Sequence, residues 1–134
     1  MTELGELSVG DSVLERDADS GYRLRASRCP HCGDVRVPPR ELCANDATPC
    51  TRTGLTGAGT IYEAVRVAIP PQGFDTSFWA GYIDLDEGVR FFAQIACADG
   101  ESPPRHGQRV QMNVQWIGNS DRRVLAPVFA RVAN

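Results

Sequence analysis

The sequence predicts a mainly β protein, built from a small cysteine-rich module followed by a five-stranded barrel. Two observations predict this fold. Four of the five cysteines lie between Cys29 and Cys50, and five short runs with the pattern of strands follow from Gly57 onward. We therefore expect three parts in the 134-residue chain: an N-terminal segment over 1–22, the cysteine module over 23–54 and the barrel over 55–134.

The five runs are typical of half-buried strands because apolar and polar residues alternate along them. In the first run, Ile61, Val65, Val67 and Ile69 are expected on one face. Pro127 cannot donate to a ladder, so part of the last run should lie at an edge or a bulge. Five strands favour an OB-fold barrel, with an open sandwich as the alternative. The predicted strands are residues 60–69, 79–85, 89–96, 109–116 and 124–132.

The N-terminal segment is polar and acidic, with scattered apolar residues. A short helix around residues 9–16 is the structure we expect there, because Val9, Val13 and Leu14 are its apolar points.

The cysteine cluster predicts a zinc ribbon. Cys29-Pro30-His31-Cys32-Gly33 places two thiolates two residues apart, followed by a glycine that lets the chain turn. Zinc prefers four thiolate or imidazole ligands in a tetrahedron, and two such knuckles supply them. We expect a structural zinc held by Cys29, Cys32, Cys43 and Cys50, with no open position for chemistry.

The second half of this site is irregular, because Asp46 stands where a regular C-x-x-C motif has its second cysteine. Two alternatives follow. Asp46 could be the fourth ligand, since zinc accepts carboxylate oxygen, or the ribbon could be a degenerate one without metal. His31 lies between two ligands and should point away from the metal.

Composition excludes several classes of function. The apolar runs are too short to span a membrane, and the N-terminus lacks the features of a secretory signal, so we expect a cytoplasmic protein. A net charge of −3 and a pI near 5.3 argue against binding of nucleic acid.

The order of three motifs resembles one known family over about residues 22–117. The motifs are Leu24-Arg25-Ala26-Ser27-Arg28-Cys29-Pro30-His31-Cys32-Gly33 with Pro38-Pro39-Arg40 and Cys43, then Thr56-Gly57-Ala58-Gly59-Thr60-Ile61-Tyr62, then Asp84-Leu85-Asp86-Glu87-Gly88-Val89-Arg90. The sequence is similar to the domain-of-unknown-function family thirty-five, a rubredoxin-like zinc ribbon followed by an OB-fold. Asp46 departs from the regular ribbon of that family.

The resemblance implies an accessory subunit. Members accompany thiolase-fold proteins, which include thiolases, aldolases and ketosynthase-like acyltransferases, and help shape the passage for an acyl-CoA or other acyl-thioester substrate. Phe74, Phe78 and Trp79 could contact the partner or an acyl chain, or plug one end of the barrel. Arg40 could offer its guanidinium to CoA phosphates.

Two other functions compete with this one. The first is a free-standing enzyme that acts through the barrel, through the aromatic loop, or through Cys97 and His106, which lie near the two ends of one loop. The second is a binder of single-stranded nucleic acid, a function that other OB-folds perform. We assign no catalytic residue from the sequence.

Overall fold

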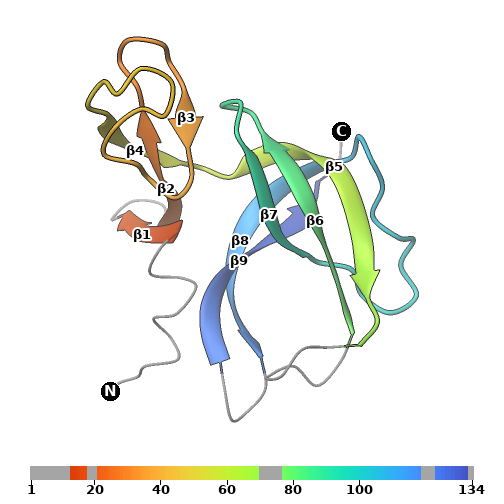
Figure 1. Cartoon of the computed structure of the whole chain (residues 1–134). Coiled ribbons are helices and arrows are strands. Elements are labelled where there is room, and N and C mark those ends of the chain that lie inside the picture. The colour runs from red at the N-terminus through yellow and green to blue at the C-terminus, as the bar shows by residue number, and fades with distance from the viewer. Residues whose placement is uncertain (1–12, 18–20, 70–76, 119–122, 133–134) are drawn as a thin grey trace.

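The computed structural model describes residues 13–17, 21–69, 77–118 and 123–132. The strands of these residues form two sheets, one from the N-terminal part of the chain and one from the rest (Figure 1). The first sheet contains β1 (Leu14–Asp17), β2 (Gly21–Arg28), β3 (Val35–Arg36) and β4 (Thr51–Leu55). The second contains β5 (Ala58–Val67), β6 (Phe78–Leu85), β7 (Arg90–Ile95), β8 (Arg109–Gly118) and β9 (Arg123–Arg131).

The N-terminal sheet is organised around β2, which pairs antiparallel with β1, β3 and β4. The helix predicted around residues 9–16 is wrong over residues 14–16, which lie in β1. A short isolated helix is marginal in water, whereas pairing of Leu14 with Leu24 buries both side chains. The part of that prediction before residue 13 lies outside the described residues.

The second sheet is a closed barrel in the order β5-β6-β7-β9-β8, which confirms the predicted five-stranded barrel. Closure requires two long-range pairings. The first residues of β5 pair with β8, from Ala58 opposite Gln111, and β7 pairs parallel with β9, at Gln94 opposite Val128. The open sandwich is excluded, because a sandwich would leave these edges unpaired.

Each barrel strand lies within two residues of its predicted bounds. Pro127 lies in β9 opposite Val114, just before the residues at which β9 also pairs with β7. The strand is thus paired on one side only at this point, as the missing N–H of a proline requires. The predicted boundaries at 22/23 and 54/55 stay predictions.

A β-bulge in β5 overturns the predicted face of that strand. The register with β6 shifts between Ile61 and Glu63, so that one extra residue is inserted. Because side chains alternate with period two, the residues beyond the bulge change faces. Ile61 is fully buried, but Val65 is 48% exposed and Ile69 87% exposed. Ala64 takes the inward position instead and packs against the core.

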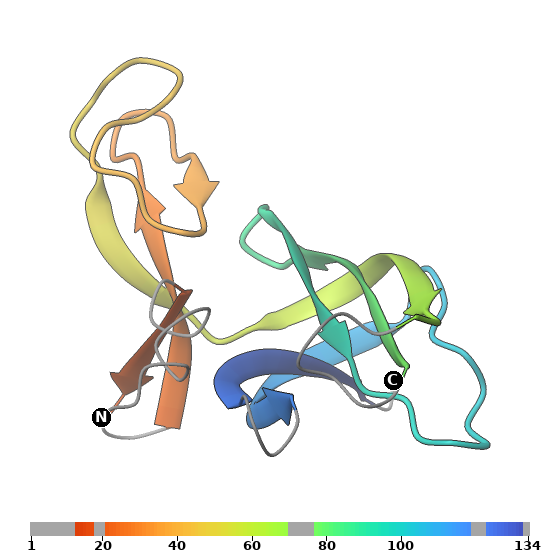
Figure 2. The ribbon, with the colours of Figure 1, turned by 60° about the horizontal axis from the view of Figure 1, so that its bottom comes forward.

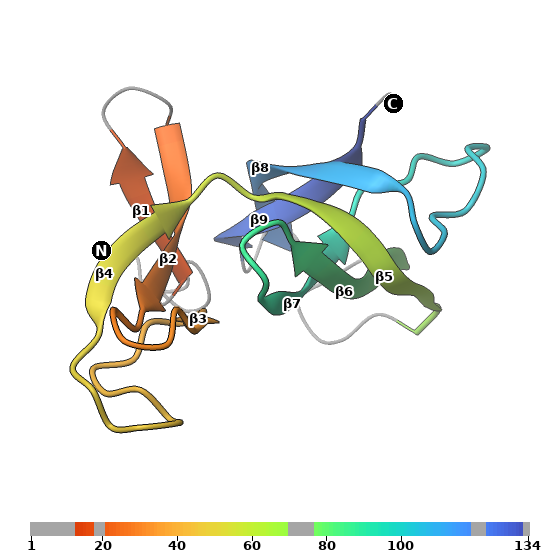
Figure 3. The same ribbon diagram turned by 90° about the horizontal axis from the view of Figure 1, so that it is seen from above.

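One continuous hydrophobic core joins the two sheets. The barrel contributes Ile61, Ile83, Ile95, Val110 and Phe129, all nearly inaccessible to solvent, and the N-terminal sheet contributes Leu24, Ala26, Val35 and Leu55. Figures 2 and 3 show the N-terminal sheet beside the barrel, with β4 leading directly into β5. None of the described residues forms a helix that is long and apolar enough to cross a membrane.

The bulge requires a glycine on the neighbouring strand. A Cβ atom at Gly81 would collide with the carbonyl oxygen of Glu63 and approach Ala64 Cα to 2.8 Å. We expect Gly81→Ala to lower the free energy of unfolding by about 1–3 kcal/mol, the usual cost of overpacking. Denaturant unfolding checks this through a lower midpoint with an unchanged slope. An unchanged midpoint would show that the bulge relaxes without cost.

Candidate functional site

The candidate metal site is built from two knuckles with the same backbone hydrogen bonds. In the first, Gly33 N donates to the carbonyl of Cys29 at 2.8 Å, and Cys29 N donates to the carbonyl of Asp34 at 2.9 Å. In the second, Ala47 N donates to the carbonyl of Cys43 at 2.8 Å, and Cys43 N to that of Thr48 at 2.9 Å. The donors and acceptors have the same spacing in both loops.

This repeat assigns equivalent positions in the two knuckles. Cys43 corresponds to Cys29, and Asp46 corresponds to Cys32. Gly33 has a φ of 82°, and Ala47 at the matching position has a φ of 62°. An L-residue with a side chain rarely adopts that conformation, so the backbone of the second knuckle is held to the same turn despite its sequence.

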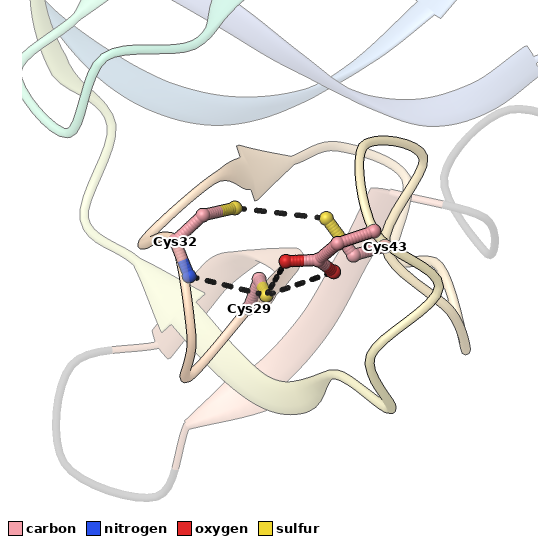
Figure 4. A group of neighbouring side chains, drawn as sticks. Cys29, Cys32 and Cys43 are labelled. Atoms are coloured by element: carbon pink, nitrogen blue, oxygen red, sulfur yellow. Dashed lines mark hydrogen bonds between the residues drawn. The ribbon is translucent and has the colours of Figure 1, made fainter.

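The two knuckles bring three thiols and one carboxylate together, namely Cys29, Cys32, Cys43 and Asp46, whose ligand atoms all lie within 4.8 Å of one another. Figure 4 shows the three sulfurs converging from the two loops. The sulfurs of Cys32 and Cys43 are 3.6 Å apart, and the sulfur of Cys29 is 3.8 Å from Asp46 Oδ1. A zinc tetrahedron with bonds of about 2.0–2.3 Å has edges of about 3.5–3.8 Å. These two distances match such edges, and the group offers four ligand atoms to a structural zinc.

Asp46 is held in place by its neighbours. Thr48 N donates to Oδ1 at 3.0 Å, and His31 Nδ1 lies 2.9 Å from Oδ2. The hydrogen bonds from Thr48, and then the one from His31, hold the pKa of Asp46 well below its usual range. His31 is not among the converging ligand atoms and contacts the carboxylate of Asp46 through Nδ1.

Amide donors also stabilise negative charge on sulfur. Cys32 N lies 3.4 Å from the sulfur of Cys29, and Asn45 N lies 3.4 Å from that of Cys43. The Cys32 amide lowers the pKa of the buried Cys29 thiol against the opposing effect of burial. The Asn45 amide acts in the same direction on Cys43, but burial and the side chains of Cys32 and Cys29 outweigh it and raise the pKa of that thiol to about 11. The donor on Cys29 thus favours the thiolate, which is the form that binds metal.

The structure does not bring Cys50 into this group. Its thiol contacts the carbonyl of Thr48 at 3.7 Å, and its N–H donates to the carbonyl of Glu41 at 2.8 Å. Burial raises the pKa of this thiol. Cys50 thus follows the second knuckle and leads into β4.

The predicted contact residues are dispersed. Phe78 and Trp79 are half-buried at the start of β6, and Trp79 packs against the core. Phe78 also lines an apolar cavity of about 300 Å³. Arg40 is exposed within the ribbon, where its backbone N–H donates to the buried Ser27 hydroxyl at 3.0 Å. Phe74 lies outside the described residues.

Cys97 and His106 have different neighbours. The thiol of Cys97 contacts the carbonyl of Ser102 at 3.6 Å and the guanidinium of Arg131 at 3.7 Å. His106 Nδ1 lies 2.7 Å from the carbonyl oxygen of Tyr62, to which it must donate. The described contacts therefore give Cys97 no histidine base.

The structure reveals an aromatic face that the sequence pattern did not predict. Tyr62, Tyr82 and Phe92 are each 41–55% exposed on the outer side of β5, β6 and β7. Tyr82 is paired with Phe92, and their rings lie edge to face at 5.2 Å. The guanidinium of Arg90 lies 3.6 Å from the centre of the Tyr62 ring and also forms an ion pair with Asp84 at 2.7 Å. Knowledge of the hairpin register would have placed Tyr82 beside Phe92.

Comparison with known families explains the order of these parts. Residues 16–48 match the family described as ChsH2, rubredoxin-like zinc ribbon domain, and residues 53–115 match ChsH2, C-terminal OB-fold domain. The chain thus combines the two ChsH2 domain types, a zinc ribbon followed by an OB-fold. A structural zinc fits the ribbon, because the matched domain is a zinc ribbon and the structure supplies three thiols and a carboxylate for it.

Curated relatives fall into two groups. A DUF35 domain-containing scaffold protein of Methanocaldococcus jannaschii is 33% identical over 78 residues, which are 55% of either chain. The chain thus spans about half the length of that relative. The benzoylsuccinyl-CoA thiolase subunit BbsA of Geobacter metallireducens is 28% identical over 90% of this chain and 84% of its own. BbsA of Thauera aromatica is 32% identical over 66% of this chain and 62% of its own.

A solved structure has the same fold. A chain of the assembly named "Ltp2-ChsH2(DUF35) aldolase" superposes with a TM-score of 0.66, at 21% identity, over 83% of this chain and 86% of that one. The likeness extends over both sheets and agrees with the two matched domains.

The equivalent turns of the two knuckles generate a matched pair of substitutions. Gly33→Ala places a side chain where φ is 82°, in open space, whereas Ala47→Gly removes one where φ is 62°. We expect the first to lower and the second to raise the free energy of unfolding, each by about 1 kcal/mol. Denaturant unfolding of the zinc-loaded chain measures both. If both substitutions changed the free energy of unfolding in the same direction, the two turns would not be equivalent.

Proposed function

We propose that this chain is an accessory subunit that binds a thiolase-like protein and helps to form the passage for its acyl-CoA or acyl-thioester substrate. The observation that carries the proposal is the zinc ribbon followed by the OB-fold in a chain that is similar to proteins named as subunits of a thiolase. The superposed structure is named as an aldolase of Ltp2 with ChsH2, which supports a partner of this class.

The aromatic face of Tyr62, Tyr82 and Phe92 is the surface that we assign to the partner. Exposed aromatic side chains and arginine are enriched at the centres of protein interfaces. Arg90 is already fixed over Tyr62 and paired with Asp84, so little side-chain entropy would be lost when a partner covers it. The face is also rigid, because it stands on three hydrogen-bonded strands of the barrel.

The acyl-thioester passage is the finer part of the proposal. Phe78 lines an apolar cavity with Phe92, and Phe92 belongs to the aromatic face. A partner that covered this face would enclose the cavity, and an acyl chain could then lie between the two proteins. Within this proposal Phe78, Trp79 and Phe74 contact the acyl chain or the partner, and Arg40 pairs with phosphate groups.

The charges of the chain disfavour the competing nucleic-acid function. Binding of a single strand needs a positive groove beside stacking aromatic rings. Asp84 neutralises Arg90 on the aromatic face, and the net charge of the chain is −3. We accordingly propose that the chain binds a protein partner and not nucleic acid. We also propose that it acts in the cytoplasm.

Co-expression tests the proposed partnership. We expect a thiolase-like protein encoded near this chain to co-purify with it as a stable hetero-oligomer through size exclusion. The isolated chain should not turn over acyl-CoA, because the contacts described for Cys97 and His106 form no nucleophile–base pair. Acyl-thioester turnover by the isolated chain would contradict the proposal and support the free-standing enzyme.

Substitution of the aromatic face tests where the partner binds. We expect Tyr82→Ser combined with Phe92→Ser to weaken the complex at least about a hundredfold, as loss of interface anchors does. Trp116→Ser is the matched control, since this aromatic residue is 48% exposed but lies on β8. Titration calorimetry with the co-purified partner measures the three affinities. Equal losses from the control and the double variant would place the interface elsewhere.

A further inference from the structure

We infer that zinc in this chain is bound by three sulfurs and one oxygen, from Cys29, Cys32, Cys43 and Asp46, and that Cys50 remains a free thiol. This ligand set differs from the four cysteines that the sequence pattern favours. It concerns the ribbon alone and holds whichever partner the chain binds.

The first argument is the internal repeat of the ribbon. Both knuckles close with the same pair of backbone hydrogen bonds, and the residue three positions after the first cysteine is Cys32 in one loop and Asp46 in the other. The first knuckle presents Cys32 to the site. The second therefore presents Asp46 to the same point from the opposite side.

The second argument is the bonding capacity of the carboxylate. An ionised carboxylate has about four lone-pair positions on its two oxygens. Thr48 N and His31 Nδ1 take one position on each oxygen. Each oxygen keeps one position for a metal, and the two hydrogen bonds fix the orientation of the group. Zinc-binding carboxylates are held by such outer partners.

The third argument concerns Cys50. Ala47 N and Thr48 O bond back to Cys43, so the loop from Cys43 is already closed at residue 48. Cys50 comes after this closure, and its own N–H and thiol are engaged with Glu41 and Thr48. Its sulfur is not among the ligand atoms that converge on the site. The matched zinc ribbon domain also ends at residue 48.

Cobalt substitution of the full chain tests the ligand set. Charge transfer from thiolate to Co²⁺ absorbs in proportion to the number of sulfur ligands, so this band counts them. We expect Cys50→Ser to leave the band intensity and the zinc affinity unchanged. Asp46→Cys should fold like the original and raise the intensity by about one third, from three sulfurs to four.

Loss of the carboxylate provides the second measurement. We expect Asp46→Ala to weaken zinc binding more than about a hundredfold, which exceeds the loss caused by removal of an outer-shell partner. Competition with a metal indicator measures this affinity. A quarter less charge-transfer intensity in Cys50→Ser, together with unchanged zinc affinity in Asp46→Ala, would overturn the inference. Failure of the original chain to bind Zn²⁺ or Co²⁺ would overturn it as well.

Discussion

The barrel depends on one strand, β5, which must pair with β6 along its length and with β8 over its first residues. A straight strand cannot follow both neighbours around a closed barrel of this size, and the bulge between Ile61 and Glu63 supplies the bend. The bulge takes the Tyr62 carbonyl out of the ladder, and His106 Nδ1 donates to it. Arg109 on β8 ties the same region together through Thr60 and Asp86. The bend that closes the core thus also turns Tyr62 outward, toward Arg90.

The ribbon is constrained differently, because its loops bury few side chains. Between β2 and β4, the chain from Pro30 to Cys50 consists mostly of exposed residues. Backbone hydrogen bonds and the four converging side chains hold it in shape, so metal binding and folding of this part are coupled. A closed ligand set also leaves no position for a substrate. The metal site therefore has a structural role, and contacts with other molecules are made by other surfaces of the chain.

Much of this could be predicted from the sequence, because period-two alternation and cysteine spacing are local signals. The side chains of Val110 and Met112 on β8 are buried in the core, as the alternation predicts. The alternation failed at Val65, since counting by two cannot detect an inserted residue. Cysteine spacing likewise could not decide whether Asp46 or Cys50 joins the other three side chains. That choice depends on which loop residues form backbone hydrogen bonds with Cys43. Leu14 lies in a strand only because β2 offers an edge 10 residues further on, and the first 22 residues alone do not specify that partner.

The surfaces left by this construction differ in character, and the difference limits how the protein can act. The ribbon presents polar loops around the candidate metal ligands, whereas the outer side of β5, β6 and β7 presents Tyr82 and Phe92 next to an apolar cavity. Exposed aromatic groups on a rigid sheet cost free energy in water until something covers them. A protein bound to this face would bury its aromatic side chains and would also close the cavity. Within the proposed function, the barrel would complete a site that is shared by two chains.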